Sequence, residues 1–376
     1  MDKRCRSANS NPATGKKFDM RSVAARAGVS TATVSRTINN VPSVDAALAK
    51  RVWEAIKELN YRPNTSARAL VSGRSGLLGL IVSEITNPFF PELIQSFEHI
   101  AVKRGYEILI ASTSYDPQKM NDCVRRMLER SVDGIAVMTF GMEEPLLGEL
   151  AAHHFPLVSV DAGIKSTRVA TLAIDYRQGL RQAVQHLAAL GHREMAFISG
   201  PMHLHSSKTR QLAFLESMRE IGAPVKSSWV REGNHRLEGG TACMHAILDT
   251  GDVPSAVLCS NDVTAIGVLH ALAASGLRVP QDMSVVGFDD IPMARFTVPP
   301  LTTIRMSPDD LTSAAVDSLI AQIGAAEGES IGVPKEIKTN LVVRQTTNFR
   351  DKSMQAFAPG PSDLDMPHKT VLSEKH

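Results

Sequence analysis

The sequence has few cysteines and no long apolar run, and each shortage excludes a class of protein. Its 376 residues include four cysteines, none in a CxxC pair, so nothing indicates a zinc or redox motif and the thiols should be reduced and structural. Residues 1–17 are basic but lack the apolar stretch of a secretion signal, and no later run is long enough to span a bilayer. We therefore expect a cytoplasmic, nucleoid-associated protein.

Catalytic fingerprints are missing as well. The chain contains no GxSxG elbow, P-loop, HExxH or GxGxxG motif. The HLH at 203–205 is too short a pattern to indicate a metal site. A transport receptor would need a secretion signal and no basic amino-terminal segment. We predict no enzymatic activity, no metal and no cofactor other than a small-molecule effector.

Residues 20–40 have the pattern of two short helices joined by a tight turn. Asp19 can cap the first helix, and Gly28 ends it because glycine readily adopts left-handed backbone geometry. Ser30 can then cap the second helix. Small apolar residues of the first helix recur at helical spacing, namely Val23, Ala24 and Ala27. This is a helix-turn-helix pattern, although two helices and a glycine turn also occur in ordinary helical domains.

The second helix has the composition of a helix that packs on one side and reads a DNA groove on the other. Val34 and Ile38 share its apolar face. Arg36 can offer a bidentate hydrogen-bonding fork to guanine, and the short side chains around it allow the backbone to come close to the DNA. The predicted DNA contacts of this region are Met20, Ser30, Thr31, Ala32, Thr33, Ser35, Arg36 and Asn39.

Two further segments complete the predicted DNA-binding part. A third helix is predicted over 45–59, capped by Ser43, because its apolar residues fall on one helical face. The turn over 65–70 that follows is too short to form a stable helix alone, so we interpret it as a hinge that folds against a partner. Its predicted DNA contacts are Asn64, Arg68 at a phosphate or in the minor groove, and Leu70 as an apolar wedge.

Charge is distributed unevenly along the chain. Residues 1–75 hold 14 basic and 5 acidic residues, a surplus of +9, whereas the whole chain carries +2 and the remainder therefore −7. A basic head on an acidic body is typical of a nucleic-acid reader whose other part has a different role.

Beyond Gly76, short apolar runs alternate with amphipathic helices. Strands are predicted at 77–82, 107–111, 134–137 and 157–160, and then at 195–198, around 230, at 255–259 and at 284–286. Continuous apolar strands separated by helices predict parallel sheets that are covered on both faces. We expect two similar doubly wound halves.

In such sheets a ligand binds beyond the carboxyl ends of the strands. After the first strand, Asn87 offers a polar contact, and Phe89 and Phe90 offer aromatic faces for an apolar ring or a sugar, unless both belong to the core. Polar residues that follow later strands can converge on the same cleft and bind a polyhydroxylated ligand, namely Asp161, Arg210, Asn261 and Asp289.

Three other carboxylates near these positions have a structural alternative. Asp262 and Asp290 can cap helices or hold loops rather than contact a ligand. Asp175 can orient Arg210 or cap its own helix.

Several separate motifs resemble the lactose-repressor (LacI/GalR) family of bacterial transcription regulators. They are GVSTATVSRTINN, PNTSARAL, SNDVTAIG and VVGFDD followed by PPLTTIR, and the resemblance runs roughly from Phe18 to Asn348. It implies a periplasmic-binding-protein-like fold for the larger part, with chain crossovers near Ile174 and Thr303 and a late strand over 340–344 that would belong to the first half. It also implies a homodimer that clamps a pseudo-palindromic double-stranded DNA operator and changes its affinity when a small molecule binds.

The resemblance favours Arg210, Asn261 and Asp289 as effector contacts. His235 is also predicted as a contact, although it departs from the family's sugar-binding pattern, in which its position is often aromatic. The loop residues His203, His205 and Lys208 would suit an anionic ligand, or they form a solvated loop. We predict a repressor of a carbohydrate-utilisation operon with a sugar, sugar acid or sugar phosphate as effector. The alternatives are a purine or other non-sugar corepressor and, with the least support, a solute-binding or catalytic protein of the same fold.

The predicted organisation has five parts. They are a disordered basic arm (1–17), the helix-turn-helix domain (18–62), the hinge helix and linker (63–75), the effector-binding and dimerisation domain (76–350) and a disordered tail (351–376). Within the fourth part, lobe 1 would comprise about 76–174 and 304–340, and lobe 2 about 175–303 and 341–350. The tail lacks the heptads of a tetramerisation bundle, so we expect a dimer.

Overall fold

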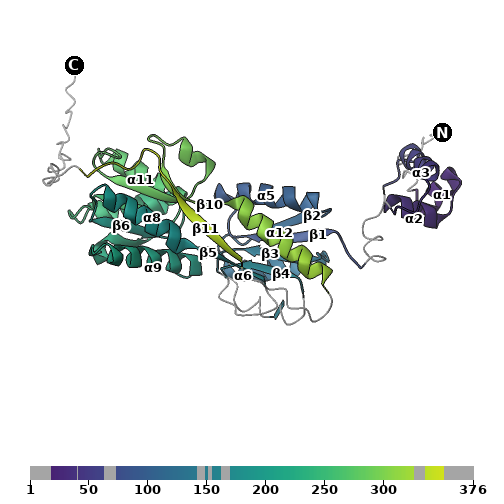
Figure 1. Ribbon diagram of the computed structural model, residues 1–376, viewed down its shortest axis with the longest axis horizontal. Coiled ribbons are helices and arrows are strands. Elements are labelled where there is room, and N and C mark those ends of the chain that lie inside the picture. The colour runs from purple at the N-terminus through teal and green to yellow at the C-terminus, as the bar shows by residue number, and fades with distance from the viewer. Residues whose placement is uncertain are drawn as a thin grey trace, which may run out of the picture. The chain divides into compact units, whose positions relative to one another are not determined.

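The computed structural model describes residues 18–39, 41–62, 73–141, 149–150, 155–161, 170–325 and 335–350 (Figure 1). The chain divides into two compact units after Ser75. The predicted arm, the hinge contacts Asn64, Arg68 and Leu70, and the predicted tail lie outside the described residues. Within the described ranges, no helix has the length and apolar character that a membrane span requires.

The first unit contains three helices, α1 (Met20–Ala27), α2 (Thr31–Ile38) and α3 (Ala46–Glu58). Two predicted caps are present, since Asp19 accepts the Ser22 N–H and Ser30 accepts the Thr33 N–H. The third cap was predicted wrongly. Asp45, not Ser43, accepts the N–H groups of Ala47 and Leu48 at 2.9 and 3.2 Å, because the helix starts at Ala46 and the residue directly before it can reach these free donors.

Gly28 fixes the turn between α1 and α2. Its φ of +63° is left-handed, and Arg51 of α3 donates from Nη2 to the carbonyls of Ala27 and Gly28 at 2.5 and 3.2 Å. A Cβ at position 28 would lie 2.5 Å from that nitrogen, so the left-handed backbone favours glycine and a larger residue would also displace the Arg51 guanidinium. Val23, Val34 and Val52, one from each helix, are fully buried together and orient α2.

The second unit is built on one row of strands. They are β1 (Leu77–Val82), β2 (Glu107–Ser112), β3 (Gly134–Met138), β4 (Leu157–Val160), β5 (Ala170–Asp175), β6 (Met195–Ser199), β7 (Val230–Glu232), β8 (Ala256–Cys259), β9 (Ser284–Asp289), β10 (Thr302–Met306) and β11 (Lys335–Val342). Their order is β2-β1-β3-β4-β5-β11-β10-β9-β8-β6-β7. The five parallel strands β2-β1-β3-β4-β5 at one end of this order have the same connectivity as β7-β6-β8-β9-β10 at the other end. The unit therefore consists of two similarly built lobes.

Helices cover both faces of the first lobe, which comprises β1 to β5 with α5 (Phe89–Lys103), α6 (Pro117–Glu129) and α12 (Pro308–Gly324). Alternate residues of β1 explain this layering. Leu78 and Leu80 belong to the core cluster that includes Phe97 of α5, whereas Ile81 belongs to a separate cluster with Met127 of α6. Because successive side chains of a strand point to opposite faces, a strand covered on both sides must be apolar throughout.

The second lobe has the same plan, with β6 to β10, α8 (Tyr176–Ala189), α9 (His205–Glu220), α10 (Leu237–Leu248) and α11 (Asp262–Ala274). Two short 3₁₀ turns, η1 (Ser227–Trp229) and η2 (Pro292–Arg295), complete it. Helix α8 packs on α9, and α10 packs on α11. The lobe is therefore also a sheet between two helical layers.

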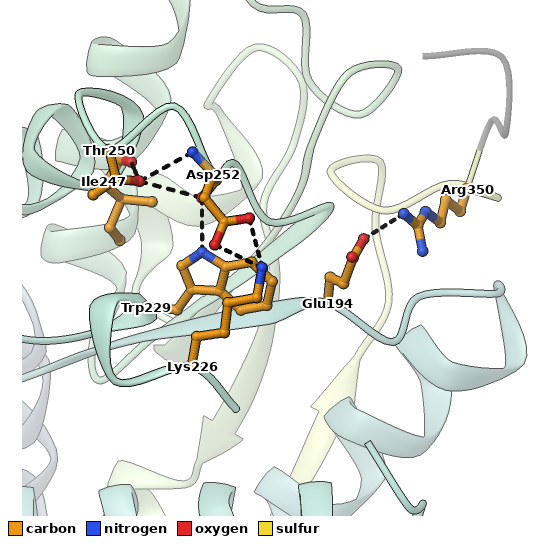
Figure 2. Close-up of polar contacts among 7 residues, drawn as sticks. All are labelled: Glu194, Lys226, Trp229, Ile247, Thr250, Asp252 and Arg350. Carbon is orange, nitrogen blue, oxygen red and sulfur yellow. Dashed lines mark hydrogen bonds and ion pairs between the residues drawn. The ribbon is translucent and has the colours of Figure 1, made fainter. Parts of the chain in front are cut away.

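A polar cluster around Asp252 anchors the segment before β7 (Figure 2). Lys226 Nζ lies 2.6 Å from both carboxylate oxygens of Asp252, and the buried Trp229 donates from Nε1 to the Asp252 carbonyl at 2.8 Å. Figure 2 also shows the ion pair between Arg350 and Glu194, which ties the end of the described chain to the lobe. None of these residues lines the ligand pocket described below, so the cluster is structural.

Strand β11 joins the two lobes, and here the sequence prediction was wrong. Residues 335–338 pair in parallel with β5, whereas 339–342 pair antiparallel with β10 of the second lobe. The segment 340–344 therefore does not belong to the first half. The strand begins earlier than predicted, and it is long enough for its first half to pair with the first lobe and its second half with the second lobe.

Candidate functional site

The outer face of α2 carries most of the predicted DNA contacts. Thr31, Ala32, Arg36 and Asn39 are exposed, while Thr33 and Ser35 are half-buried. Ser30 and Thr33 hydrogen-bond each other in the cap, and Met20 packs against the core of the unit. The exposed residues are therefore the ones that are accessible to a DNA groove. Arg36 is the one cation within α2.

A pocket lies at the carboxyl ends of the strands in the second unit. Seven of the eight predicted effector contacts line it, namely Asn87, Phe89, Phe90, Arg210, His235, Asn261 and Asp289. Residues that sequence reasoning missed complete the lining, namely Ser83, Tyr115, Thr139, Phe140, Leu204, Ser206 and Met306. Both lobes thus contribute, as expected where the strand order reverses in each sheet.

The first lobe supplies an aromatic wall. The rings of Phe89, Phe90 and Phe140 contact one another edge to face, with centroids 5.4 to 6.0 Å apart. Asn87 accepts the Phe89 N–H at 3.1 Å and so fixes the start of α5. Both phenylalanines of α5 belong to the core and also line the pocket, so the two alternatives considered from the sequence are not exclusive.

The second lobe supplies a charged wall centred on Arg210. The Arg210 guanidinium donates to the Ser260 carbonyl at 2.5 Å and lies 3.8 Å from the Asp289 carboxylate. Its carbon is 4.1 Å from the Phe288 ring centroid and 4.8 Å from that of Tyr176, so the cation is held between two aromatic faces. The Nε atom has no hydrogen-bond partner within the described structure.

Asp289 is a buried carboxyl that resists ionisation. Burial raises its pKa to about 7, and the nearby Arg210 opposes this only in part. Its φ of +108° is unusual for a residue other than glycine, which places the carboxyl into the pocket at a backbone cost. Near neutral pH this group can therefore either donate or accept a hydrogen bond.

Asp161 does not line the pocket, contrary to the sequence prediction. Its carboxylate accepts the Tyr176 hydroxyl and, at 3.0 Å, the Ile174 N–H. Burial raises its pKa, while the Tyr176 hydrogen bond lowers it. Both oxygens of Asp161 are therefore already occupied by the protein, and its contribution to the charged wall is indirect, because it holds the Tyr176 ring on which Arg210 packs.

Asn261 and His235 hold each other in place. Asn261 accepts the Thr264 N–H at 2.9 Å, which caps α11, and its amide donates to the His235 carbonyl at 3.1 Å. His235 has a left-handed φ of +61°, and its ring centroid lies 6.0 Å from that of Tyr115. Burial lowers its pKa to about 3, so the imidazole is neutral.

The three carboxylates for which the sequence left two roles possible all form hydrogen bonds or ion pairs within the protein. Asp262 accepts the Thr303 hydroxyl at 2.5 Å and the Ile291 N–H at 2.8 Å, and Asp290 pairs with Arg344. Asp175 caps α8 through the Gln178 N–H at 3.0 Å.

The histidine-rich segment 203–208 does not contribute to the pocket. His203, His205 and Lys208 are exposed and do not line it, but only His203 lies in the loop after β6, whereas His205 and Lys208 belong to the first turn of α9. No group of three potential metal ligands occurs within the described ranges.

Strand-end position could have identified some of the missed residues. Ser83 and Thr139 directly follow β1 and β3, and Tyr115 lies in the loop after β2, where an aromatic residue was overlooked. Met306 is the last residue of β10, but its apolar side chain carried no polar or aromatic signal there.

Comparison with known proteins gives consistent matches. Residues 19–64 match the bacterial regulatory proteins of the lacI family, and residues 184–347 match the periplasmic binding protein-like domain. The HTH-type transcriptional repressor PurR of Pasteurella multocida (strain Pm70) is 35% identical over 332 residues, which is 88% of this chain and 99% of the relative. The lac repressor dimer bound to operator and the anti-inducer ONPF has a TM-score of 0.78 at 28% identity, covering 89% of this chain and 100% of that chain. A complex of the transcriptional regulator CelR with cellobiose has a TM-score of 0.65 at 29% identity, covering 88% and 99%.

Proposed function

Because the chain belongs to the lacI family of bacterial regulatory proteins and is a DNA-binding transcriptional repressor, we propose that a purine or other non-sugar corepressor sets its affinity for operator DNA. The observation that carries this proposal is the asymmetry of the pocket. Three phenylalanine rings form one wall, and Arg210, Asp289 and His235 stand on the other.

A flat heterocycle fits this asymmetry. Its face can pack on Phe89, Phe90 or Phe140, while its edge can exchange hydrogen bonds with Arg210 and Asp289. Arg210 Nε and the Thr139 hydroxyl are buried without a partner in the described structure, and a ligand edge with acceptors would satisfy such donors.

A sugar effector, the main prediction from the sequence, has less support. The relatives at 35% identity are named PurR, a name that refers to purines, whereas the neighbour in complex with cellobiose is 29% identical. A sugar also needs hydrogen-bond partners around its whole edge. Phe89, Phe90 and Phe140 offer only aromatic carbon, and Asn87 already accepts a backbone N–H. The Ser83 hydroxyl already donates to the Thr139 carbonyl, which leaves the Thr139 and Tyr115 hydroxyls as the first lobe's polar groups for a ligand among the described residues.

We further propose that the repressor acts as a homodimer. Met293, Phe296 and Val298 form a short apolar patch after β9, with Phe296 82% and Val298 94% exposed. Such exposure is typical of an interface, and the lac repressor that it resembles is dimeric. Two α2 helices would then enter successive major-groove half-sites, with Arg36, Thr31 and Ala32 at base edges.

The hinge contributes the coupling in this proposal. Paired Leu70 side chains would open a base step in the minor groove, with Asn64 and Arg68 beside them. Ligand closure of the pocket would make hinge folding more or less favourable, by no more than the difference in ligand affinity between the two states.

A thermal-shift screen tests the effector class. Adenine, guanine and hypoxanthine form the purine arm, and glucose, galactose and cellobiose form the sugar arm. A ligand that binds only the native state raises the midpoint, by about 2.7 kcal/mol of stability at a hundred times its Kd. We expect a shift in the purine arm that disappears in Asp289→Ala and persists in Asp282→Ala, which lies outside the pocket. A shift confined to the sugar arm would contradict the proposal.

A further inference from the structure

An ion pair joins the two lobes beside the ligand pocket. Arg236 Nη2 lies 3.2 Å from Glu84 Oε2. Glu84 follows β1 in the first lobe, and Arg236 stands directly before α10 in the second. Each is the neighbour in sequence of a pocket residue, Ser83 on one side and His235 on the other. The pair therefore spans the cleft where the ligand would sit.

Local hydrogen bonds hold both partners in position. Glu84 accepts the Thr86 N–H at 3.3 Å through its other carboxylate oxygen, and its side chain is only 10% exposed. Arg236 donates its backbone N–H to the Asn234 side chain at 3.0 Å. Because the backbone on each side is already ordered, forming the pair costs less conformational entropy than it would between two free surface side chains.

Among the described residues, two uncharged contacts between pocket residues also join the lobes, and the Tyr176–Asp161 hydrogen bond joins them outside the pocket. The Tyr115 and His235 rings approach to 6.0 Å between centroids, and the Ser206 N–H points to the Phe140 carbonyl at 3.4 Å. The ring contact is modest and the hydrogen bond is long, so both contribute little alone.

We propose that the Glu84–Arg236 pair is a latch that sets the resting closure of the two lobes, independently of which ligand the pocket takes. With the latch closed, the aromatic wall and the charged wall already face each other before ligand arrives. A preorganised pocket binds more tightly and releases ligand more slowly than one that must close first. The latch also makes closure dependent on salt, since Arg236 is 56% exposed and the pair is screened accordingly.

Hydrogen exchange of the ligand-free, full-length protein tests the latch. We expect Arg236→Gln to increase amide exchange about three- to tenfold at about 20 mM salt, in 83–90 of the first lobe and in 233–238 of the second. The reciprocal variant, Glu84→Arg with Arg236→Glu, should recover at least half of the protection. At about 500 mM salt the difference between Arg236→Gln and the parent should shrink, because salt weakens the parental pair.

Arg177→Gln is the matched control. Arg177 pairs with Glu216 at 3.1 Å, and both residues belong to the second lobe. This variant should leave cleft exchange unchanged. Faster exchange in Arg236→Gln that is confined to 233–238 would show only a loosened start of α10 and would overturn the latch, as would equal exchange in both variants. Because no ligand and no DNA are present, the result stands apart from the proposed effector class.

Discussion

Replacement of Asp289 by asparagine should change how stability depends on pH. The pKa of this carboxyl is about 7 in the folded chain and 3.8 without burial. Between these values the folded chain binds more protons at Asp289 than the unfolded chain does. The contribution of Asp289 to stability is therefore fully present below pH 3.8, falls as pH rises, and is lost above pH 7.

The size of the effect follows from the width of the window. Each pH unit inside it costs about 1.4 kcal/mol. From pH 5 to the folded pKa of about 7 is two units, so the parent should lose about 2.7 kcal/mol relative to Asp289→Asn, and no more above pH 8. The effect of His235 on the pH dependence of stability is opposite, because its lowered pKa makes stability rise with pH up to about 6.5. It is present in both chains, so the difference between them isolates Asp289.

Urea unfolding at pH 5, 6, 7 and 8 measures this difference. Asp282→Asn is the control, because Arg278 lowers the pKa of Asp282 and its contribution is lost only in acid. The difference in free energy of unfolding between Asp282→Asn and the parent should not change from pH 5 to 8. An equally flat difference for Asp289→Asn would mean that Asp289 ionises like an exposed carboxyl, which would refute the electrostatic account of the charged wall.

Two further predictions concern DNA binding, and one concerns the stability of the first unit. Arg36→Ala should lower affinity for operator by about 1–3 kcal/mol and reduce sequence discrimination, measured by fluorescence anisotropy on operator and random duplexes; equal loss on both would argue against base reading. Gly28→Ala should destabilise the first unit by about 2–3 kcal/mol, from left-handed strain and the displaced Arg51, while the calorimetric transition of the second unit stays unchanged. Leu70→Ala should weaken binding to operator more than to random duplex in the same titration, and a uniform loss would count against the wedge.

Local patterns predicted the first unit well. The Asp19 and Ser30 caps, the Gly28 turn and the buried Val34 all follow from interactions within a few residues, which sequence spacing encodes directly. The Asp45 cap was missed because two acceptors, Ser43 and Asp45, compete over three residues, and only the start of the helix decides between them.

Strand ends also predicted most of the pocket, because the wiring of parallel sheets brings these ends together. The sequence could not predict which of these polar groups form hydrogen bonds within the protein and are therefore not available to a ligand. Asp161 and Asn261 both follow strands. The carboxylate of Asp161 accepts hydrogen bonds from Tyr176 and Ile174 and does not line the pocket, whereas Asn261 caps α11 and still lines it. Such outcomes depend on contacts between residues far apart in the chain.

The position of α12 has a consequence for the order in which the protein is made. This helix packs on α5, about two hundred residues earlier in the chain, and against β3 and β4, about 150 to 170 residues earlier. On the ribosome, the part of the first-lobe sheet that α12 covers, at β3 and β4, therefore waits for residues 308–324 to emerge, by which time β6 to β10 of the second lobe have already been made. The lobe that is synthesised first therefore cannot finish folding until most of the second lobe has been made, and the apolar surface under α12 is open to aggregation until then.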